Sequence, residues 1–130
     1  MREFDSDLMS LEEALLTIET ELWTGGPEVI RKHADVECVV VFAEMVAKMS
    51  CEDMARTSEK GRWRDVKMTK KGFVRLSDSA AIVSYECTAM RKDGLPHHSY
   101  ISSGYVRRGS EWKLTFHQQT ELRTGAKGVP

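Results

Sequence analysis

Residues 99–120 read SYISSGYVRRGSEWKLTFHQQT, and this stretch decides the fold. It predicts two long strands joined by a tight turn at Arg108-Gly109-Ser110, with Trp112 just after the turn. Tyr, Ile, Val, Thr, Trp and Phe dominate both sides of the turn, and these residue types suit a pleated, half-buried surface. A two-stranded ribbon alone is barely stable in water, so the hairpin needs a second layer that the rest of the chain must supply.

The residues that precede the hairpin continue the strand pattern. We expect strands at 62–70, 73–76, 80–91, 95–107 and 111–122. The first two of these segments can equally form one bent strand. Between the later segments, Asp93-Gly94 is typical of a tight hairpin turn, because both residues tolerate positive φ angles. The second half of the chain therefore predicts a run of antiparallel strands.

The first helix is predicted from an apolar stripe at three- and four-residue spacing. Its members are Leu8, Leu11, Leu15, Ile18 and Leu22. The acidic residues Glu12, Glu13, Glu19 and Glu21 lie mostly off that stripe. Gly25-Gly26 ends this helix, and Pro27 begins a second, shorter one that runs to about His33.

A strand and a third helix complete the first half of the chain. From Val36 to Phe42 the residues are nearly all β-branched or aromatic, which predicts a buried strand. Ser50 is expected to cap a short helix that ends at Lys60-Gly61. This order predicts an α+β domain, in which about three helices pack on one face of a strongly curved antiparallel sheet.

Length and composition bound the class of protein. With 130 residues, the chain predicts one soluble domain at residues 1–123 and a flexible C-terminal tail at 124–130. The net charge of −1 argues against a nucleic-acid partner, and the longest apolar run, at 38–43, is too short to span a membrane. Three cysteines without paired spacing, and no secretory signal, predict reduced thiols in a cytoplasmic protein.

A set of short motifs spans the chain from about Leu8 to Thr120. They are Leu22-Trp23-Thr24-Gly25, His33-Ala34-Asp35, Val39-Val40-Val41-Phe42, Met49-Ser50, Arg91-Lys92-Asp93-Gly94, Tyr105-Val106-Arg107-Arg108-Gly109, Trp112-Lys113-Leu114 and His117-Gln118. In this order they resemble the nuclear transport factor 2-like superfamily, in its SnoaL-like, ketosteroid-isomerase-like branch of unassigned function. The resemblance implies a cone, in which a bent antiparallel sheet wraps round the first helix and leaves a pocket at the open end. Homodimers packed through the sheet are common in such a family.

The isomerase mechanism of this branch does not transfer to this chain. The resemblance places the helix-one tyrosine near Ile18 and the base near Val41 or Phe42. The protonated aspartic acid falls between Ile101 and Ser103. These side chains are apolar or weakly polar, whereas proton transfer between carbons needs a group that can hold the proton. We therefore expect no isomerase activity of that type.

The other ionisable residues predict no metal site and no cofactor. His97 and His98 are consecutive in a strand, so only one of them can face inward. His117 and one of that pair supply two metal ligands, where a site needs about three. The basic residues between Arg62 and Lys71 are interpreted as a solvated outer face.

A ligand pocket is predicted where the cone brings several elements together. The expected lining residues are Trp23, Phe42, Trp63, Tyr85, Ser103, Tyr105 and Gln118. Aromatic walls with a few polar groups are typical of small-molecule sites. A two- or four-residue turn loop pairs Tyr105 with Leu114 and Ser103 with Phe116, whereas a three-residue loop with a bulge shifts the pairing by one.

The face that each residue of the last strand presents follows from that register. If Trp112, Leu114, Phe116 and Gln118 point inward, then Thr115, His117 and Gln119 lie on the outer face. These patterns predict a domain that binds an apolar or aromatic small molecule and forms a homodimer through the outer sheet face. Two alternatives stay open. One is an isomerase, hydrolase or cyclase that uses His33, one of His97 and His98, or Tyr85; the other is a dimerising interaction module whose cone is filled by its own side chains.

Overall fold

The computed structural model describes residues 2–122, with side chains from Ser10 onward. In this part of the chain the helices are α1 (Arg2–Thr24), α2 (Pro27–His33) and α3 (Cys51–Thr57). The strands are β1 (Ala34–Val41), β2 (Val46–Ser50), β3 (Trp63–Ser77), β4 (Ala80–Arg91), β5 (Pro96–Arg108) and β6 (Glu111–Glu121). The predicted α+β class is confirmed. The predicted tail at 124–130 lies outside the described residues.

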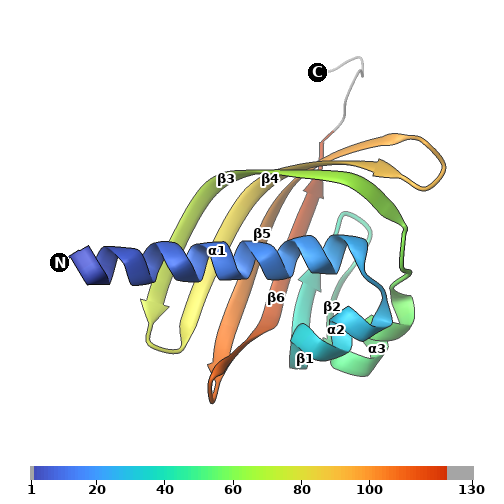
Figure 1. Ribbon diagram of the computed structural model, residues 1–130. Coiled ribbons are helices and arrows are strands. Elements are labelled where there is room, and N and C mark those ends of the chain that lie inside the picture. Colours follow the sequence, from blue (N-terminus) through green and yellow to red (C-terminus); the bar gives the residue numbers. More distant parts are fainter. Residues whose placement is uncertain (1, 123–130) are drawn as a thin grey trace.

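The six strands form one curved sheet in the order β2-β1-β6-β5-β4-β3 (Figure 1). Neighbouring strands are antiparallel except β1 and β6, which are parallel, so the sheet is mixed rather than antiparallel throughout. The chain between β1 and β6 includes α3 and four strands, a connection long enough for β6 to return in the direction of β1. The two segments predicted at 62–70 and 73–76 form the single strand β3.

One face of the sheet is covered by α1, and we call this the inner face (Figure 1). Leu15 on α1 is fully buried, and Leu11 and Leu16 are nearly so. They pack into one core with inward residues of the strands, among them Val83 and Cys87. Short helices α2 and α3 contact each other beside β1 and β2. In the described part of the chain no helix covers the opposite, outer face.

The register between β5 and β6 contains a bulge that neither predicted register describes. Tyr105 pairs with Leu114, but Gly104 pairs with Phe116 and Ser103 with His117. Thr115 is therefore the extra residue of a β-bulge, in which two residues of β6 lie opposite one residue of β5. Beyond the bulge, the side chains of β6 point to the faces opposite to those expected without it. Tyr105 and Ser103 both face inward, at 1% and 0% exposure.

The bulge corrects the facing expected for the second half of β6. His117 and Gln119 face inward, where they line a pocket, and not outward as expected. Phe116 and Gln118 face outward, because their partners Gly104 and Ser102 lie on the outer face of β5. The expected inward facing of Leu114 is unchanged, since it precedes the bulge.

Candidate functional site

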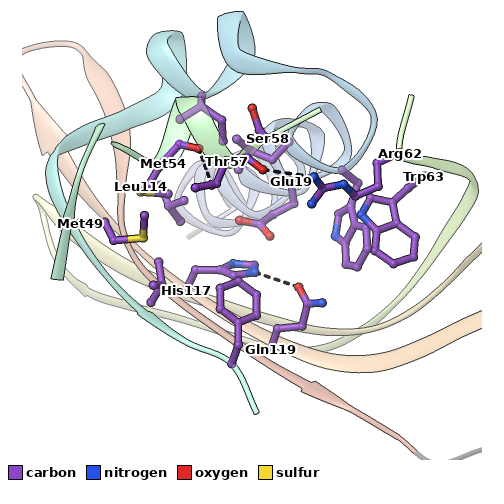
Figure 2. A pocket seen from close by; sticks show the side chains of 15 residues that line it. Glu19, Met49, Met54, Thr57, Ser58, Arg62, Trp63, Leu114, His117 and Gln119 are labelled. Carbon is purple, nitrogen blue, oxygen red and sulfur yellow. Dashed lines mark hydrogen bonds between the residues drawn. The ribbon is translucent and has the colours of Figure 1, made fainter. Parts of the chain in front are cut away.

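A pocket of about 180 Å³ opens at the end of the cone, between the last turns of α1, the helix α3 and the inner face of β1, β2 and β6 (Figure 2). Its lining is mostly apolar and aromatic. The residues are Glu19, Leu22, Trp23, Ile30, Val40, Phe42, Met49, Met54, Thr57, Ser58, Arg62, Trp63, Leu114, His117 and Gln119. Concave apolar sites with a few convergent polar groups are where small molecules usually bind.

A buried carboxylate is the most unusual group of this pocket. Glu19 is 1% exposed, and helix periodicity places it on the same face of α1 as Leu15 and Trp23, four residues to either side. The Tyr85 hydroxyl donates to Glu19 Oε1 at 2.5 Å, and the Tyr105 hydroxyl donates to Oε2 at 2.5 Å. Each carboxylate oxygen therefore accepts one hydrogen bond from a neutral donor.

The direction of the hydrogen bond between Tyr85 and Glu19 is determined by the indole of Trp23. Its Nε1–H can only donate, and it donates to the Tyr85 hydroxyl oxygen at 2.9 Å, so the Tyr85 proton points to Glu19. Burial, followed by the negative charge of Glu19, raises the pKa of both tyrosines well above the ordinary value. Both hydroxyls therefore keep their protons at any physiological pH.

Two indole rings form one wall beside this carboxylate. Trp23 ends α1 and Trp63 begins β3, and their rings meet edge to face with centroids 5.2 Å apart. His97 packs behind them, 4.5 Å from the Trp63 ring, and burial lowers the pKa of this histidine. The two indole rings are thus held in place by each other and by His97, and that of Trp23 also by its hydrogen bond to Tyr85.

The opposite wall is formed by His117 and Phe42. Ser103 Oγ lies 3.0 Å from His117 Nδ1, and Gln119 Oε1 lies 3.3 Å from Nε2, so both ring nitrogens have partners. The ring of Phe42 is 5.8 Å from that of His117. In Figure 2 Glu19 occupies the centre of the view, with His117 and Gln119 on one side of it and Trp63 on another.

The mouth of the pocket carries one cationic side chain. Arg62 donates from Nη2 to the carbonyl oxygen of Thr57 at 3.2 Å, and its Nε lies 3.7 Å from Glu59. Its side chain is 48% exposed, and its guanidinium contacts these two partners. Figure 2 shows it beside Thr57 and Ser58.

The predicted pocket residues divide into three groups in the structure. Trp23, Phe42 and Trp63 line the pocket directly. Tyr85, Tyr105 and Ser103 lie in the layer behind it and position Glu19 and His117. Gln118 lies on the outer face, because of the bulge at Thr115.

Sequence reasoning missed four polar residues of the site, among them Gln119, which was assigned to the outer face. Glu19 was placed off the apolar stripe, although its spacing from Leu15 and Trp23 puts it on the buried face of α1. His117 was assigned to the outer face, and Arg62 to a solvated basic segment. The sequence did contain a signal for Glu19. It lies four residues from Leu15 on one side and four residues from Trp23 on the other, a spacing that places all three on one face of a helix.

Two histidine and carboxylate pairs among the described residues lie away from this pocket, and a third, His97 with Glu121 at 3.7 Å, lies behind its indole wall. His33 pairs with Glu21 at 2.8 Å on the surface. His98 pairs with Glu86 at 2.5 Å on another part of the sheet. No group of three or more His, Cys, Asp or Glu side chains among the described residues could hold a metal ion. Of the residues considered for an enzyme, His33 and His98 therefore lie away from the pocket, whereas Tyr85 lies behind its wall and is bonded to Glu19.

Comparisons with known proteins inform the fold. No family model and no curated protein matches the sequence. A ketosteroid isomerase-like protein from Erwinia carotovora atroseptica superposes with a TM-score of 0.71 at 14% identity, covering 90% of this chain and 97% of that one. An NTF2-like protein of unknown function from Prochlorococcus marinus gives a TM-score of 0.65 at 14% identity, with coverages of 86% and 93%.

A third similar structure is the association domain of C. elegans CaMKII. It has a TM-score of 0.68 at 14% identity and covers 88% of this chain and 95% of that chain. At such identities the likeness concerns the fold and not the activity. The chain therefore has the nuclear transport factor 2-like fold, in a form shared with ketosteroid isomerase-like proteins and proteins of unknown function.

Proposed function

We propose that this chain is a small-molecule-binding domain, whose ligand is apolar or aromatic and occupies the pocket between α1, α3 and β6. The observation that carries the proposal is the open space beside Trp23, Trp63 and Phe42, which the side chains of the cone leave unfilled. A cavity of about 150 Å³ accommodates benzene. The 180 Å³ pocket therefore suits one ring or a compact group of similar size.

The chain's own tryptophans provide the test. Of its three tryptophans, Trp23 and Trp63 line the pocket, whereas Trp112 does not. We expect single-ring fragments to shift the indole N–H signals of Trp23 and Trp63 in ¹H–¹⁵N spectra and to leave Trp112 unchanged. A fragment library that shifts none of these signals, or shifts all of them equally, would contradict a ligand site at this position.

We also propose that a second copy of the chain packs on the outer face of the sheet. Register aligns Val39, Phe116, Gly104, Ile82 and Val74 in one row across five strands. Ile82, Val39 and Val74 are 38%, 41% and 54% exposed. A contiguous exposed apolar surface of this kind is typical of an interface, and a two-fold contact lets the same row meet itself. The similar structure described as an association domain supports the same proposal.

Sedimentation at micromolar concentration tests this contact. The expected species has twice the chain mass of 14.8 kDa, and Ile82→Lys should reduce it to one chain. Thr88→Lys is the matched control, because Thr88 is exposed on the same face of the same strand but lies outside the apolar row. A wild-type protein of 14.8 kDa, or equal dissociation by both variants, would refute the interface.

We propose a reducing, cytoplasmic environment from the state of the thiols. All three cysteines are free, and burial raises the pKa of Cys38 and of Cys87 to about 12. Free cysteines seldom persist in oxidising compartments. Titration of the denatured protein taken from its own cells should find three free thiols. In the described part of the chain no helix is long and apolar enough to cross a membrane.

A further inference from the structure

The pocket contains a buried carboxyl group for which the described part of the chain supplies no salt-bridge partner. Glu19 is 1% exposed, and its two recorded partners, Tyr85 and Tyr105, are neutral donors. The arginine of the lining, Arg62, donates to the Thr57 carbonyl and lies beside Glu59, and the ring nitrogens of His117 have Ser103 and Gln119 as partners. The hydroxyls stabilise the carboxylate without cancelling its charge.

The carboxylate still has hydrogen-bonding capacity toward the pocket. An ionised carboxylate offers about four acceptor positions, and the two tyrosines occupy one on each oxygen. Buried charges are costly unless they are paired. A ligand that brings a positive charge beside Glu19 therefore gains more from this site than a neutral ligand of the same shape does.

The aromatic walls favour the same kind of ligand. Cations are attracted to the faces of indole and phenyl rings, and aromatic cages that bind quaternary ammonium groups use this attraction. Trp23 and Trp63 line the pocket together with Glu19, and their rings stand at 73° to each other. Phe42, which directly follows β1, contributes a third aromatic ring to the pocket lining.

We propose that the ligand of this pocket is a small organic ammonium ion with alkyl substituents, whose charge pairs with Glu19 and whose alkyl groups contact Trp23, Trp63 and Phe42. This inference rests on the proposed function, because it names the ligand class of the same pocket. The space of about 180 Å³ accommodates a trimethylammonium group, which is similar in size to the benzene that fits about 150 Å³. An anion is disfavoured by Glu19, and a metal ion lacks further ligands there.

The test compares choline with 3,3-dimethylbutan-1-ol, which has the same shape with carbon in place of the charged nitrogen. Binding is measured by titration of the Trp23 and Trp63 indole signals, with Trp112 as the internal reference. We expect choline to bind at least tenfold more tightly than the neutral alcohol. If the alcohol binds equally or more tightly, the ammonium inference fails while the proposed ligand pocket stands. If neither probe shifts the pocket indoles, the ammonium inference fails, and the single-ring fragments decide the proposed pocket separately.

Two variants assign the preference to the carboxylate. Glu19→Gln removes the charge, and the amide can still accept from Tyr85 and donate to Tyr105, so the network is expected to persist. This variant should lose the preference for choline. Glu21→Gln removes an equal charge from the exposed side of the same helix and should keep the preference. A preference that survives in Glu19→Gln overturns the role of Glu19.

A third variant keeps the inference testable if Glu19→Gln fails to fold. Trp63→Leu removes one indole face from a half-buried position and leaves the carboxylate in place. We expect choline binding to weaken several-fold more than binding of the neutral alcohol, with both followed by the indole N–H signal of Trp23. If the binding of both probes weakened equally, the indole of Trp63 would act through its shape alone, and the proposed attraction between the aromatic rings and the ammonium charge would be overturned.

Discussion

The hydroxyl of Tyr105 is predicted to be one of the largest single polar contributions to the stability of this domain. Tyr105 is 1% exposed, and its hydroxyl is the recorded hydrogen-bond partner of Glu19 Oε2 at 2.5 Å. Tyr105→Phe keeps the ring and removes this donor, which leaves one oxygen of a buried carboxylate without a partner. Hydrogen bonds to charged groups contribute about 1.5–3 kcal/mol, and burial prevents water from replacing this one.

The expected change is large enough to measure by two methods. The free energy of unfolding from urea titration should fall by about 1.5–3 kcal/mol, with the slope against urea unchanged. For a chain of 130 residues, an unfolding entropy of about 2.1 cal/mol/K per residue converts this loss into a melting temperature lower by about 5–10 °C. Tyr100→Phe is the matched control, because Tyr100 is 49% exposed, and it should change stability by less than about 0.5 kcal/mol.

A double-mutant cycle separates the effect of charge from the effect of packing. In the Glu19→Gln background, Tyr105→Phe removes a neutral hydrogen bond, which contributes only about 0.5–1.5 kcal/mol. The same substitution should therefore cost less there than in the wild type. Equal costs in the two backgrounds, or a loss no larger than that of Tyr100→Phe, would refute the reasoning that a buried charge depends on this hydroxyl.

Three further predictions concern contacts outside the pocket. Arg108 donates two hydrogen bonds to Asp35, at 2.7 and 3.2 Å, and thereby lowers the pKa of that carboxyl in the folded protein. The ionised carboxylate therefore stabilises the fold above about pH 3.9, the ordinary pKa of aspartic acid. This stabilisation is lost as the pH falls through the lower pKa of Asp35 in the folded state. Asp35→Asn should accordingly lower the melting temperature at pH 7 and much less at pH 3. Ser50→Ala should cost about 1 kcal/mol in urea unfolding, because Ser50 Oγ accepts from the Asp53 amide at 3.0 Å as the cap of α3; an unchanged midpoint would contradict this. Gly94→Ala should cost about 1 kcal/mol or more, since Gly94 has a φ of +90°, and an equally stable variant would show that the turn can rearrange.

Local interactions explain why much of the fold could be predicted. Gly109 and Gly94 adopt positive φ in the two hairpin turns expected from their sequence, and Ser50 caps α3 as its side-chain chemistry predicts. Among the described side chains of the predicted stripe, Leu11 and Leu15 are buried against the sheet, and Ile18 and Leu22 pack partly buried beside them. Each of these features depends on residues within a few positions of one another, so the chain's local pattern is sufficient.

The candidate site could be predicted only in part, because its polar contacts join residues far apart in the sequence. The aromatic residues Trp23, Phe42 and Trp63 were expected in the pocket from the cone that the family resemblance implies. Glu19 was not, since its burial depends on hydroxyls of Tyr85 and Tyr105, which are 66 and 86 residues away. A carboxylate on an amphipathic helix is ordinarily solvated, and only those partners make a buried position favourable.

The amino-acid sequence by itself determined the α+β class, the helix and strand order and the long hairpin at 99–120. Only the tertiary structure decided which face of that hairpin meets the pocket. The bulge at Thr115 turns His117 inward and Gln118 outward, and Thr115 Oγ1 donates to the Glu37 carbonyl of β1 at 3.1 Å. Strand side chains alternate with a period of two, so one additional residue reverses every side chain beyond it, and the pairing that sets the register forms only when the sheet assembles.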